Sequence, residues 1–265
     1  DERLEDMAIE AAKMALDNAG MKAEELDFII CSNVVNEYVT PQLSCIIQGG
    51  IGATCPCIDI NCACAGFIYA VEIAESFYQA GKVRNVLVVS AEEPTRMTDW
   101  NDRRTCVLFG DGAGAAVLAP GDNIKCVKLS ASSATDKLWQ YRLLHPTPYI
   151  TKKETDVPLQ MKGQDVFKFA VKAASKDISR VLEETGHGAD DVDHYLLHQA
   201  NIRIINAIQE YLEQPKEKFP TNIEDHGNSS SSCCPILLDE CNRKGDFKKG
   251  DLIAMSAFGA GFVPG

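Results

Sequence analysis

The chain has 265 residues, of which 45% are hydrophobic and 24% are charged, as is typical of a globular protein with a sizeable core. Its formal net charge of −12 argues against a general nucleic-acid binder, whose binding surface would be basic. No apolar run approaches the ~18 residues that cross a bilayer, and the acidic N-terminus lacks the basic region of a signal peptide, so we expect no membrane span.

Eleven cysteines are spread along the chain, and none forms a C-x-x-C pair. The spacings of zinc sites and of thioredoxin-like motifs are therefore missing, so no bound metal is expected. Most of the cysteines lie in apolar runs, which is typical of small buried side chains in a reducing cytoplasm.

The first half of the chain alternates between helices and strands. Alanines at helical spacing within residues 8–15 predict an amphipathic helix, which a glycine-containing turn connects to a buried strand at 28–31. Residues 55–61 predict a short strand that runs into a helix over 65–81, and the apolar run 86–89 predicts the next strand.

The second half follows the same alternation. Residues 123–133 predict a strand, and the irregular, proline-bearing stretch 134–160 predicts a functional or capping loop. An Ala-rich helix begins at Phe169 and leads through an acidic connection to an apolar strand that ends near His198. The run 252–255 predicts a further strand.

The two halves resemble each other. The helix and strand that follow Met7 are similar to those that follow Phe169, and the run from Gly81 is similar to the run from Gly245 at nearly the same spacing. This pattern predicts a duplicated α/β unit with halves at 1–121 and 122–265. No strand comparable with 123–133 precedes the first helix, so we expect that an N-terminal segment of the first copy is missing.

Two cysteines, Cys62 and Cys64, lie where the strand at 55–61 meets the next helix. Cys64 is at the helix start, where free N–H groups favour an anion, so we expect a lowered thiol pKa and a site that can stabilise an oxyanion. Cys62 lies on the strand side, so the helix start should stabilise its thiolate less. Gly66 permits a close approach by backbone or ligand. The stretch alone also fits two buried structural thiols.

His198 and Asn228 have similar positions elsewhere. His198 lies between a strand and a helix, and Asn228 lies in a glycine-containing turn before another helix. His198 alone is also explained as a structural histidine, and Asn228 alone as a helix cap. Under the duplication, Asn228 takes the place in the second copy that Cys64 takes in the first, so a pseudo-twofold arrangement would bring the two helix starts together.

Five segments then resemble the β-ketoacyl-acyl carrier protein synthase III family of the thiolase superfamily, in order and over nearly the whole chain: CACAGF, DRRTCVLFGDGAGAAVL, LLHQANIRII, DHGNSSSSC and FGAGF. The resemblance implies a thiolase-like αβαβα five-layer duplication, here lacking an N-terminal segment and the last strand. It also implies a cytoplasmic homodimer with no permanently bound cofactor and with a coenzyme A thioester as substrate.

The resemblance further implies a decarboxylating Claisen condensation that initiates fatty acid synthesis. Cys64 would take the acyl group of an acyl-CoA primer, and malonyl-acyl carrier protein would then condense with it to give a β-ketoacyl-acyl carrier protein. His198 and Asn228 would complete the catalytic triad by stabilising the enolate. The N–H groups of Cys64 and Ala260 would form the oxyanion hole.

The remaining implied site residues bind substrates. They are Arg103, Gly163, Phe167 and Asn201 for coenzyme A, Lys168 and Arg203 for carrier-protein docking, and Thr40 and Leu108 for the acyl pocket. Acetyl-selective relatives carry phenylalanine where Thr40 stands, in a pocket completed across the dimer. We therefore expect primers longer than acetyl.

Three positions of the sequence bear on alternative functions. A degradative thiolase would need a second cysteine in SAFGAGFVPG, and a type I or II synthase would have histidine at Asn228. A polyketide or other secondary-metabolite ketosynthase of the same type is an alternative enzyme. A non-catalytic relative that binds acyl carrier protein is an alternative of another class, because Ala260 replaces the family's oxyanion glycine.

Overall fold

The computed structural model describes residues 2–103, 105–142, 147–149 and 157–265. The α-helices within them are α1 (Leu4–Ala19), α2 (Leu43–Ile51), α3 (Gly66–Gln79), α4 (Gly163–Thr185), α5 (Ile202–Leu212), α6 (Ile223–His226) and α7 (Cys233–Lys244). The strands are β1 (Phe28–Ser32), β2 (Cys57–Ile60), β3 (Val86–Glu92), β4 (Gly112–Leu118), β5 (Leu138–Trp139), β6 (Gln160–Met161), β7 (His194–Leu197), β8 (Ile253–Ser256), β9 (Phe258–Gly259) and β10 (Val263–Pro264). None of these helices has the length and apolar character needed to cross a membrane.

The first sheet has the strand order β2-β1-β3-β4, in which β1 is parallel to β2 and β3, and β4 is antiparallel to β3. Its side chains alternate between the two faces, as the pleat of a strand requires. Ile29 and Leu87 belong to the apolar cluster with α1 and α2, and Ile30 and Val88 belong to the cluster with α3. Both faces are therefore buried, which explains why these strands are continuous apolar runs.

A second, smaller sheet pairs β7 with β8 in parallel. Tyr195 and Leu197 of β7 pack with the apolar faces of α4 and α5. Leu196 points the other way and packs against Leu237 of α7. This sheet is thus also covered by helices on both faces.

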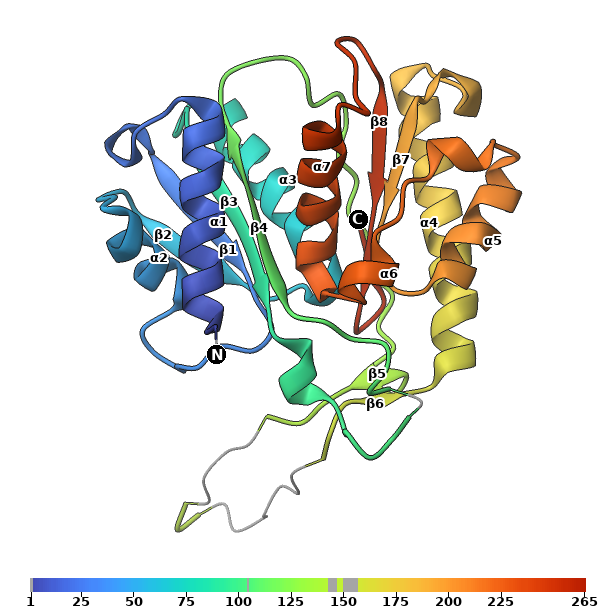
Figure 1. The fold of residues 1–265 in the computed structure, drawn as a ribbon, viewed down its shortest axis with the longest axis horizontal. Helices are drawn as coiled ribbons and strands as arrows, with labels where there is room; N and C mark the ends of the chain where they lie inside the picture. Colours follow the sequence, from blue (N-terminus) through green and yellow to red (C-terminus); the bar gives the residue numbers. More distant parts are fainter. Residues whose placement is uncertain (1, 104, 143–146, 150–156) are drawn as a thin grey trace.

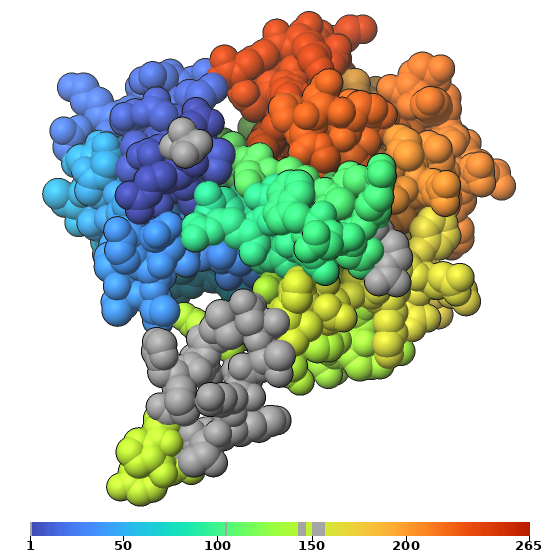
Figure 2. Space-filling view, turned by 60° about the horizontal axis from the view of Figure 1, so that its bottom comes forward, coloured from blue at the N-terminus to red at the C-terminus, as the bar shows by residue number. Residues whose placement is uncertain are grey.

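The elements stack in five layers (Figure 1): α1 and α2, the first sheet, α3 and α7, the second sheet, and α4 with α5. Cys233 and Cys234 of α7 share an apolar cluster with α3, so these two helices form the central layer. The starts of α3 and α7 meet there. On the face seen in Figure 2, the segment around residue 100 (green) lies between the elements nearest the N-terminus (blue) and those of the C-terminal half (orange).

The strand expected at 123–133 does not form. Ser130 N–H donates to Pro264 O at 3.2 Å and Ser132 N–H donates to Phe262 O at 2.9 Å, but no ladder develops. Pro264 has no N–H to return a bond, and its strand β10 spans only Val263–Pro264.

The stretch 134–160, expected to be an irregular loop, contains one short strand pairing. Leu138–Trp139 (β5) pairs antiparallel with Gln160–Met161 (β6), and Leu159 N–H donates to Met97 O at 2.8 Å. Residues 143–146 and 150–156 lie outside the described residues. The described part of this stretch packs over the site rather than linking two separate bodies.

Candidate active site

Cys64 lies in a single 3-10 turn, Ala63–Ala65, that joins β2 to α3. Ala63 has a φ of 47°, a left-handed conformation that is unusual for alanine. The helix then starts at Gly66, where the Ser32 side chain of β1 occupies the place that a Cβ would take. The close approach expected at Gly66 is therefore made by a serine of the sheet.

The turn before α7 has the same shape. Ser230 has a φ of 54°, and α7 begins three residues later, just as α3 begins three residues after Ala63. Ser230 thus corresponds to Ala63, and the counterpart of Cys64 is Ser231. The expectation that Asn228 is that counterpart is wrong by three residues, because the spacing of the other repeated elements does not hold through this turn.

The two turns touch each other. The Ser230 hydroxyl donates a hydrogen bond to the Cys64 sulfur, with Oγ and Sγ 3.4 Å apart. Ser32 Oγ, below Gly66, lies 3.2 Å from Ser231 Oγ. The structure thus brings together the two helix starts, as the duplication led us to expect.

The pKa of the Cys64 thiol is not lowered, contrary to expectation. Burial removes water from the thiolate and raises the pKa to about 12, although the Ser230 hydroxyl lowers it in part, and the negative charge of Glu92 raises it further. The expectation considered only the helix start. The loss of hydration outweighs that contribution at this buried position.

Glu92 closes β3 with a side chain that is 1% exposed. Ser231 Oγ donates to its Oε1 at 2.6 Å, Ser230 Oγ lies 3.3 Å from the same oxygen, and the Val34 N–H donates to its Oε2 at 3.0 Å. Burial raises the pKa of Glu92 to about 7 even though these donors stabilise the carboxylate. Sequence reasoning missed this residue, although a carboxylate that closes an apolar strand is a detectable signal.

His198 follows β7, and its side chain is 2% exposed. Its Nδ1 lies 2.8 Å from the sulfur of Cys233, and the Gln199 N–H donates to that sulfur at 3.4 Å. Burial raises the pKa of Cys233 well above its ordinary value, which favours a neutral thiol that can donate to Nδ1. An imidazole that accepts at Nδ1 carries its own proton on Nε2.

Asn228 precedes the Ser230 turn and is 8% exposed. Its Oδ1 accepts from the Ser230 N–H at 2.9 Å, and its backbone N–H donates to Leu108 O at 2.8 Å. With Oδ1 held by the turn, the amide N–H₂ group is the part of the side chain that can donate to a ligand.

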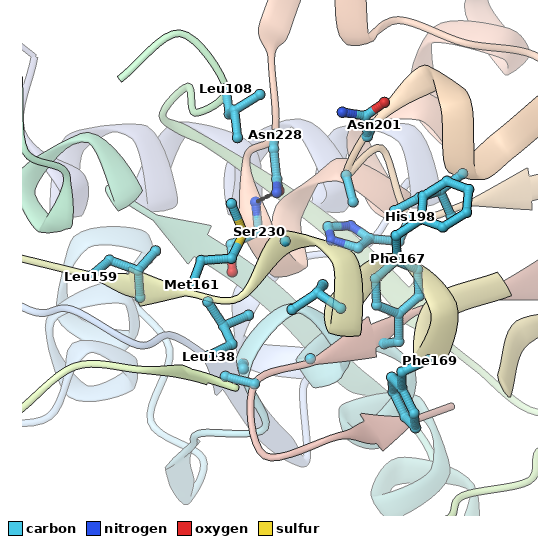
Figure 3. Close-up of a pocket in the computed structure, with 18 of the residues that line it drawn as sticks. Leu108, Leu138, Leu159, Met161, Phe167, Phe169, His198, Asn201, Asn228 and Ser230 are labelled. Atoms are coloured by element: carbon cyan, nitrogen blue, oxygen red, sulfur yellow. Dashed lines mark hydrogen bonds between the residues drawn. The ribbon is translucent and has the colours of Figure 1, made fainter. Parts of the chain in front are cut away.

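His198, Asn228 and Ser230 line one cavity of about 550 Å³. Most of its wall is apolar, and Figure 3 shows leucine and methionine side chains facing the three polar ones. Leu138, Leu159 and Met161 come from the β5–β6 region. Sequence reasoning missed these three, because isolated apolar residues in an irregular stretch have no periodicity. Cys64 is not itself among the described lining residues; its neighbour Ala63 and its contact Ser230 line the cavity beside it.

Most of the other expected site residues also line this cavity. They are Leu108, Gly163, Phe167, Lys168, Asn201, Arg203 and Ala260. Asn201 has a second role, since its Oδ1 accepts from the Arg203 N–H at 2.9 Å and caps α5. Arg103 and Thr40 are exposed and are not among the described lining residues. Within the described ranges, no cluster of three or more His, Cys, Asp or Glu side chains could hold a metal.

The turn after β8 passes very close to Cys64. A Cβ built on Gly259 would lie 2.9 Å from the Cys64 nitrogen and 2.8 Å from Cys62 O, so no side chain fits there. Ala260 is not among the described residues with positive φ. Alanine at position 260 therefore does not need a left-handed backbone, and the position that requires glycine is 259.

Two family models match the chain. The model for "3-Oxoacyl-[acyl-carrier-protein (ACP)] synthase III" matches residues 58–136, and the model for the C-terminal part of the same family matches residues 182–265. A β-ketoacyl-[acyl-carrier-protein] synthase III of Clostridium perfringens is 41% identical over 271 aligned residues, which span 100% of this chain and 84% of that protein. One of Xanthomonas euvesicatoria is 39% identical over 100% of this chain and 82% of its own length.

Solved structures show the same likeness. The 3-oxoacyl-[acyl-carrier-protein] synthase III of Aquifex aeolicus matches with a TM-score of 0.90 and 40% identity, over 100% of this chain and 83% of that one. The priming β-ketosynthase from the R1128 polyketide biosynthetic pathway matches with a TM-score of 0.88 and 32% identity, over 99% of this chain and 80% of that one. These likenesses confirm the predicted thiolase-like α/β fold.

Proposed function

The chain belongs to the 3-oxoacyl-[acyl-carrier-protein] synthase III family, and from this membership we propose that it initiates fatty acid synthesis through an acyl-Cys64 intermediate. The reaction is a decarboxylating condensation of an acyl-CoA primer with malonyl-acyl carrier protein. The observation that carries the proposal is the cavity in which His198 and Asn228 each have one polar atom already engaged, so that each presents an N–H donor.

In the first half-reaction, the sulfur of Cys64 attacks the thioester carbon of acyl-CoA and coenzyme A leaves. The tetrahedral intermediate places negative charge on the former carbonyl oxygen. The N–H groups of Cys64 and Ala260 are suited to hold that oxygen, since Gly259 brings the second turn against the Cys64 nitrogen.

In the second half-reaction, malonyl-acyl carrier protein loses carbon dioxide and leaves an enolate on its thioester oxygen. The His198 Nε2–H and the Asn228 amide donate to this oxygen, and each such donor is typically worth ~3–4 kcal/mol in the transition state. Neither side chain needs to change protonation. The carbanion then attacks the acyl-Cys64 carbonyl and releases the β-ketoacyl product.

The apolar cavity suits the pantetheine and acyl portions of these substrates. Gly163, Phe167 and Asn201 are proposed to line the pantetheine path. Lys168 and Arg203 are exposed cations among the lining residues of a chain with a net charge of −12, which supports their proposed role in docking an acidic carrier protein.

Three further parts of the proposal extend beyond this cavity. Arg103 is proposed to contact the coenzyme A nucleotide, and Thr40 to bound the acyl pocket of a second copy. The enzyme is proposed to act as a homodimer in the cytoplasm. It needs no permanently bound cofactor, because the chemistry derived above uses only its own side chains and the substrate thioesters.

Incubation with acyl-CoA, followed by intact-protein mass measurement and peptide mapping, tests the proposal. The mass should rise by one acyl group on Cys64, and malonyl-acyl carrier protein should remove it with release of carbon dioxide. Cys64→Ala should abolish both, whereas Cys62→Ala should not, because Cys62 is a nearby thiol without the Ser230 contact. Acylation elsewhere, or none, would contradict the assignment.

A priming ketosynthase of polyketide synthesis is the second candidate, because the R1128 enzyme is 32% identical over 99% of this chain. Its chemistry at Cys64 would be the same, so the two candidates differ in the carrier protein served. Condensation rates with a fatty acid carrier protein and with a polyketide carrier protein separate them. A protein that binds either carrier without acylating Cys64 would be a non-catalytic relative.

A further inference from the structure

The chemistry proposed above leaves one step without a group to perform it: removal of the proton from the Cys64 thiol. The thiol is buried, and burial holds its pKa at about 12, so little thiolate forms spontaneously near neutral pH. The side chain that touches its sulfur is Ser230, at 3.4 Å. A serine hydroxyl can relay a proton, but it is too weak a base to be the final proton acceptor.

The Glu92 carboxylate, which lies next to Ser230, is basic enough to accept a proton. Glu92 Oε1 lies 3.3 Å from Ser230 Oγ, on a side chain that is 1% exposed. Ser231 Oγ at 2.6 Å and the Val34 N–H at 3.0 Å hold the carboxyl group in place. Cys64, Ser230 and Glu92 therefore form a continuous path of hydrogen-bonding atoms from the reacting sulfur to a buried carboxylate.

The surroundings of Glu92 contain few other charges. The Cys64 thiol and the Cys31 thiol on β1 both respond to its charge through a raised pKa. The next residue of the chain, Glu93, is ion-paired with Arg96 at 3.1 Å. The residue opposite on β4 is Gly112, and α3 packs on the sheet with apolar side chains. The largest influences on the pKa of Glu92 are its burial and the hydrogen-bond donors of Ser231, Val34 and Ser230, none of which is a cation.

We propose that Glu92 is the proton acceptor for Cys64, and that Ser230 relays the proton between them. This inference rests on the proposed function and supplies its missing proton transfer. For the transfer, the Ser230 O–H turns from the Cys64 sulfur to Glu92 Oε1, 3.3 Å away. As the sulfur attacks acyl-CoA, Ser230 Oγ then accepts the thiol proton while its own proton moves to Glu92 Oε1. The carbon–sulfur bond to coenzyme A breaks, and coenzyme A leaves as a thiolate that water protonates.

The same path runs in reverse during condensation. Loss of carbon dioxide leaves one negative charge on the malonyl-derived carbon, and attack of that carbon expels the Cys64 sulfur as a thiolate. Glu92 then returns its proton through Ser230, and the resting thiol is restored. The cycle thus consumes one proton in total, which protonates coenzyme A, and it needs no other reactant.

The test compares the wild type with Glu92→Gln, which keeps the shape of the side chain but not its basicity. The readout is the rate at which iodoacetamide alkylates Cys64 between pH 5 and pH 10, followed by peptide mapping. In the wild type the rate should rise through pH ~7, where Glu92 ionises and accepts the proton, and then level off. In Glu92→Gln it should rise steadily without a plateau, and at pH 7 acylation by acyl-CoA should fall by about 10²-fold.

Ser230→Ala tests the relay separately, because it removes only the hydroxyl and keeps the backbone N–H that bonds to Asn228. It should also lose the plateau. The matched control is Ser232→Ala, a buried serine of the same turn whose hydroxyl donates to the backbone oxygens of Gly112 and Ser229. This control should keep the wild-type profile.

The relay would be overturned if folded Glu92→Gln protein showed the same pH dependence of alkylation as the wild type. If Glu92→Gln does not fold, the same pH dependence in Ser230→Ala would overturn the relay. Because alkylation needs no acyl-CoA, the relay and the proposed function fail separately. If the wild type shows the plateau but acyl-CoA never acylates it, the relay is supported and the proposed function is contradicted.

Discussion

Nδ1 of His198 lies 2.8 Å from the sulfur of Cys233, a residue 35 positions further along the chain. This contact decides which nitrogen of the imidazole faces the cavity with a proton. When the Cys233 thiol donates to Nδ1, the imidazole carries its own proton on Nε2, where it is available to an enolate oxygen. Cys233 is thus a positioning residue for His198.

Cys233→Ala should therefore lower the rate of malonyl decarboxylation by about tenfold, the value of one hydrogen bond, and leave the rate of Cys64 acylation unchanged. Cys233→Ser should restore decarboxylation, since a hydroxyl can also donate to Nδ1. Separate measurement of the two half-reactions checks this. Equal decarboxylation rates in the Ala and Ser variants would mean that the contact does not orient His198.

Asn228→Asp should keep the acylation of Cys64 but slow condensation by about 10²–10³-fold. The substitution replaces an N–H donor with a carboxylate that repels the forming enolate, and it keeps the oxygen that accepts from the Ser230 N–H. The measurement is carbon dioxide release from malonyl-acyl carrier protein by pre-acylated enzyme. An unchanged release rate would remove Asn228 from the enolate site.

Gly259→Ala and Ala260→Gly form a matched pair. A methyl group at position 259 would lie 2.9 Å from the Cys64 nitrogen and must push the two turns apart, so acylation should fall sharply and stability should drop by about 1–3 kcal/mol. Ala260→Gly should change the acylation rate little, since Ala260 lies outside the positive-φ region. Acylation assays and urea unfolding of both variants check this. The opposite ranking would locate the glycine requirement at position 260.

Thr40→Phe should shift primer preference toward acetyl-CoA. Each methylene that an open pocket buries contributes ~0.8 kcal/mol, so the present protein should favour a medium-chain primer over acetyl, by a preference on the order of 10–200-fold. Competition between acetyl-CoA and a medium-chain acyl-CoA measures it. A strong acetyl preference that Thr40→Phe leaves unchanged would assign the pocket limit to another residue.

Glu92→Gln should stabilise the protein, and only above acidic pH. Burial raises the Glu92 pKa from near 4.5 to about 7, so between these values the folded state binds a proton that the unfolded state has released. Wild-type stability therefore falls as pH rises through this window, by roughly 3 kcal/mol in total. Urea unfolding at pH 5 and pH 8 should show the variant's advantage growing. An equal difference at both values would contradict the raised pKa.

The sequence was a good guide wherever local pattern decides structure. Helical spacing located α1 and α3, and short apolar runs located β1, β3 and β8, whereas α4 begins at Gly163, before the start expected at Phe169. The segments around Cys64, His198 and Asn228 carry the family motifs, so these residues could be proposed before any geometry was known.

The contacts across the two halves could not be predicted in this way. Ser230 meets Cys64 from 166 positions away, and Glu92 meets Ser231 from 139 positions away. Such pairs depend on how the layers stack. The same reason explains the wrong expectation for the Cys64 pKa, because a helix start is visible in sequence whereas the depth of burial is not.

The first sheet ends in the edge strand β2, whose outer side has no partner among the described strands. It pairs with β1 on one side only, at the outer edge of the first sheet, and its Ile58 side chain is 42% exposed. An edge of this kind can template pairing with another strand. If a second copy of the chain pairs with this edge, stability should depend on concentration. Dilution alone would then lower thermal stability and promote aggregation, without any substitution in the cavity.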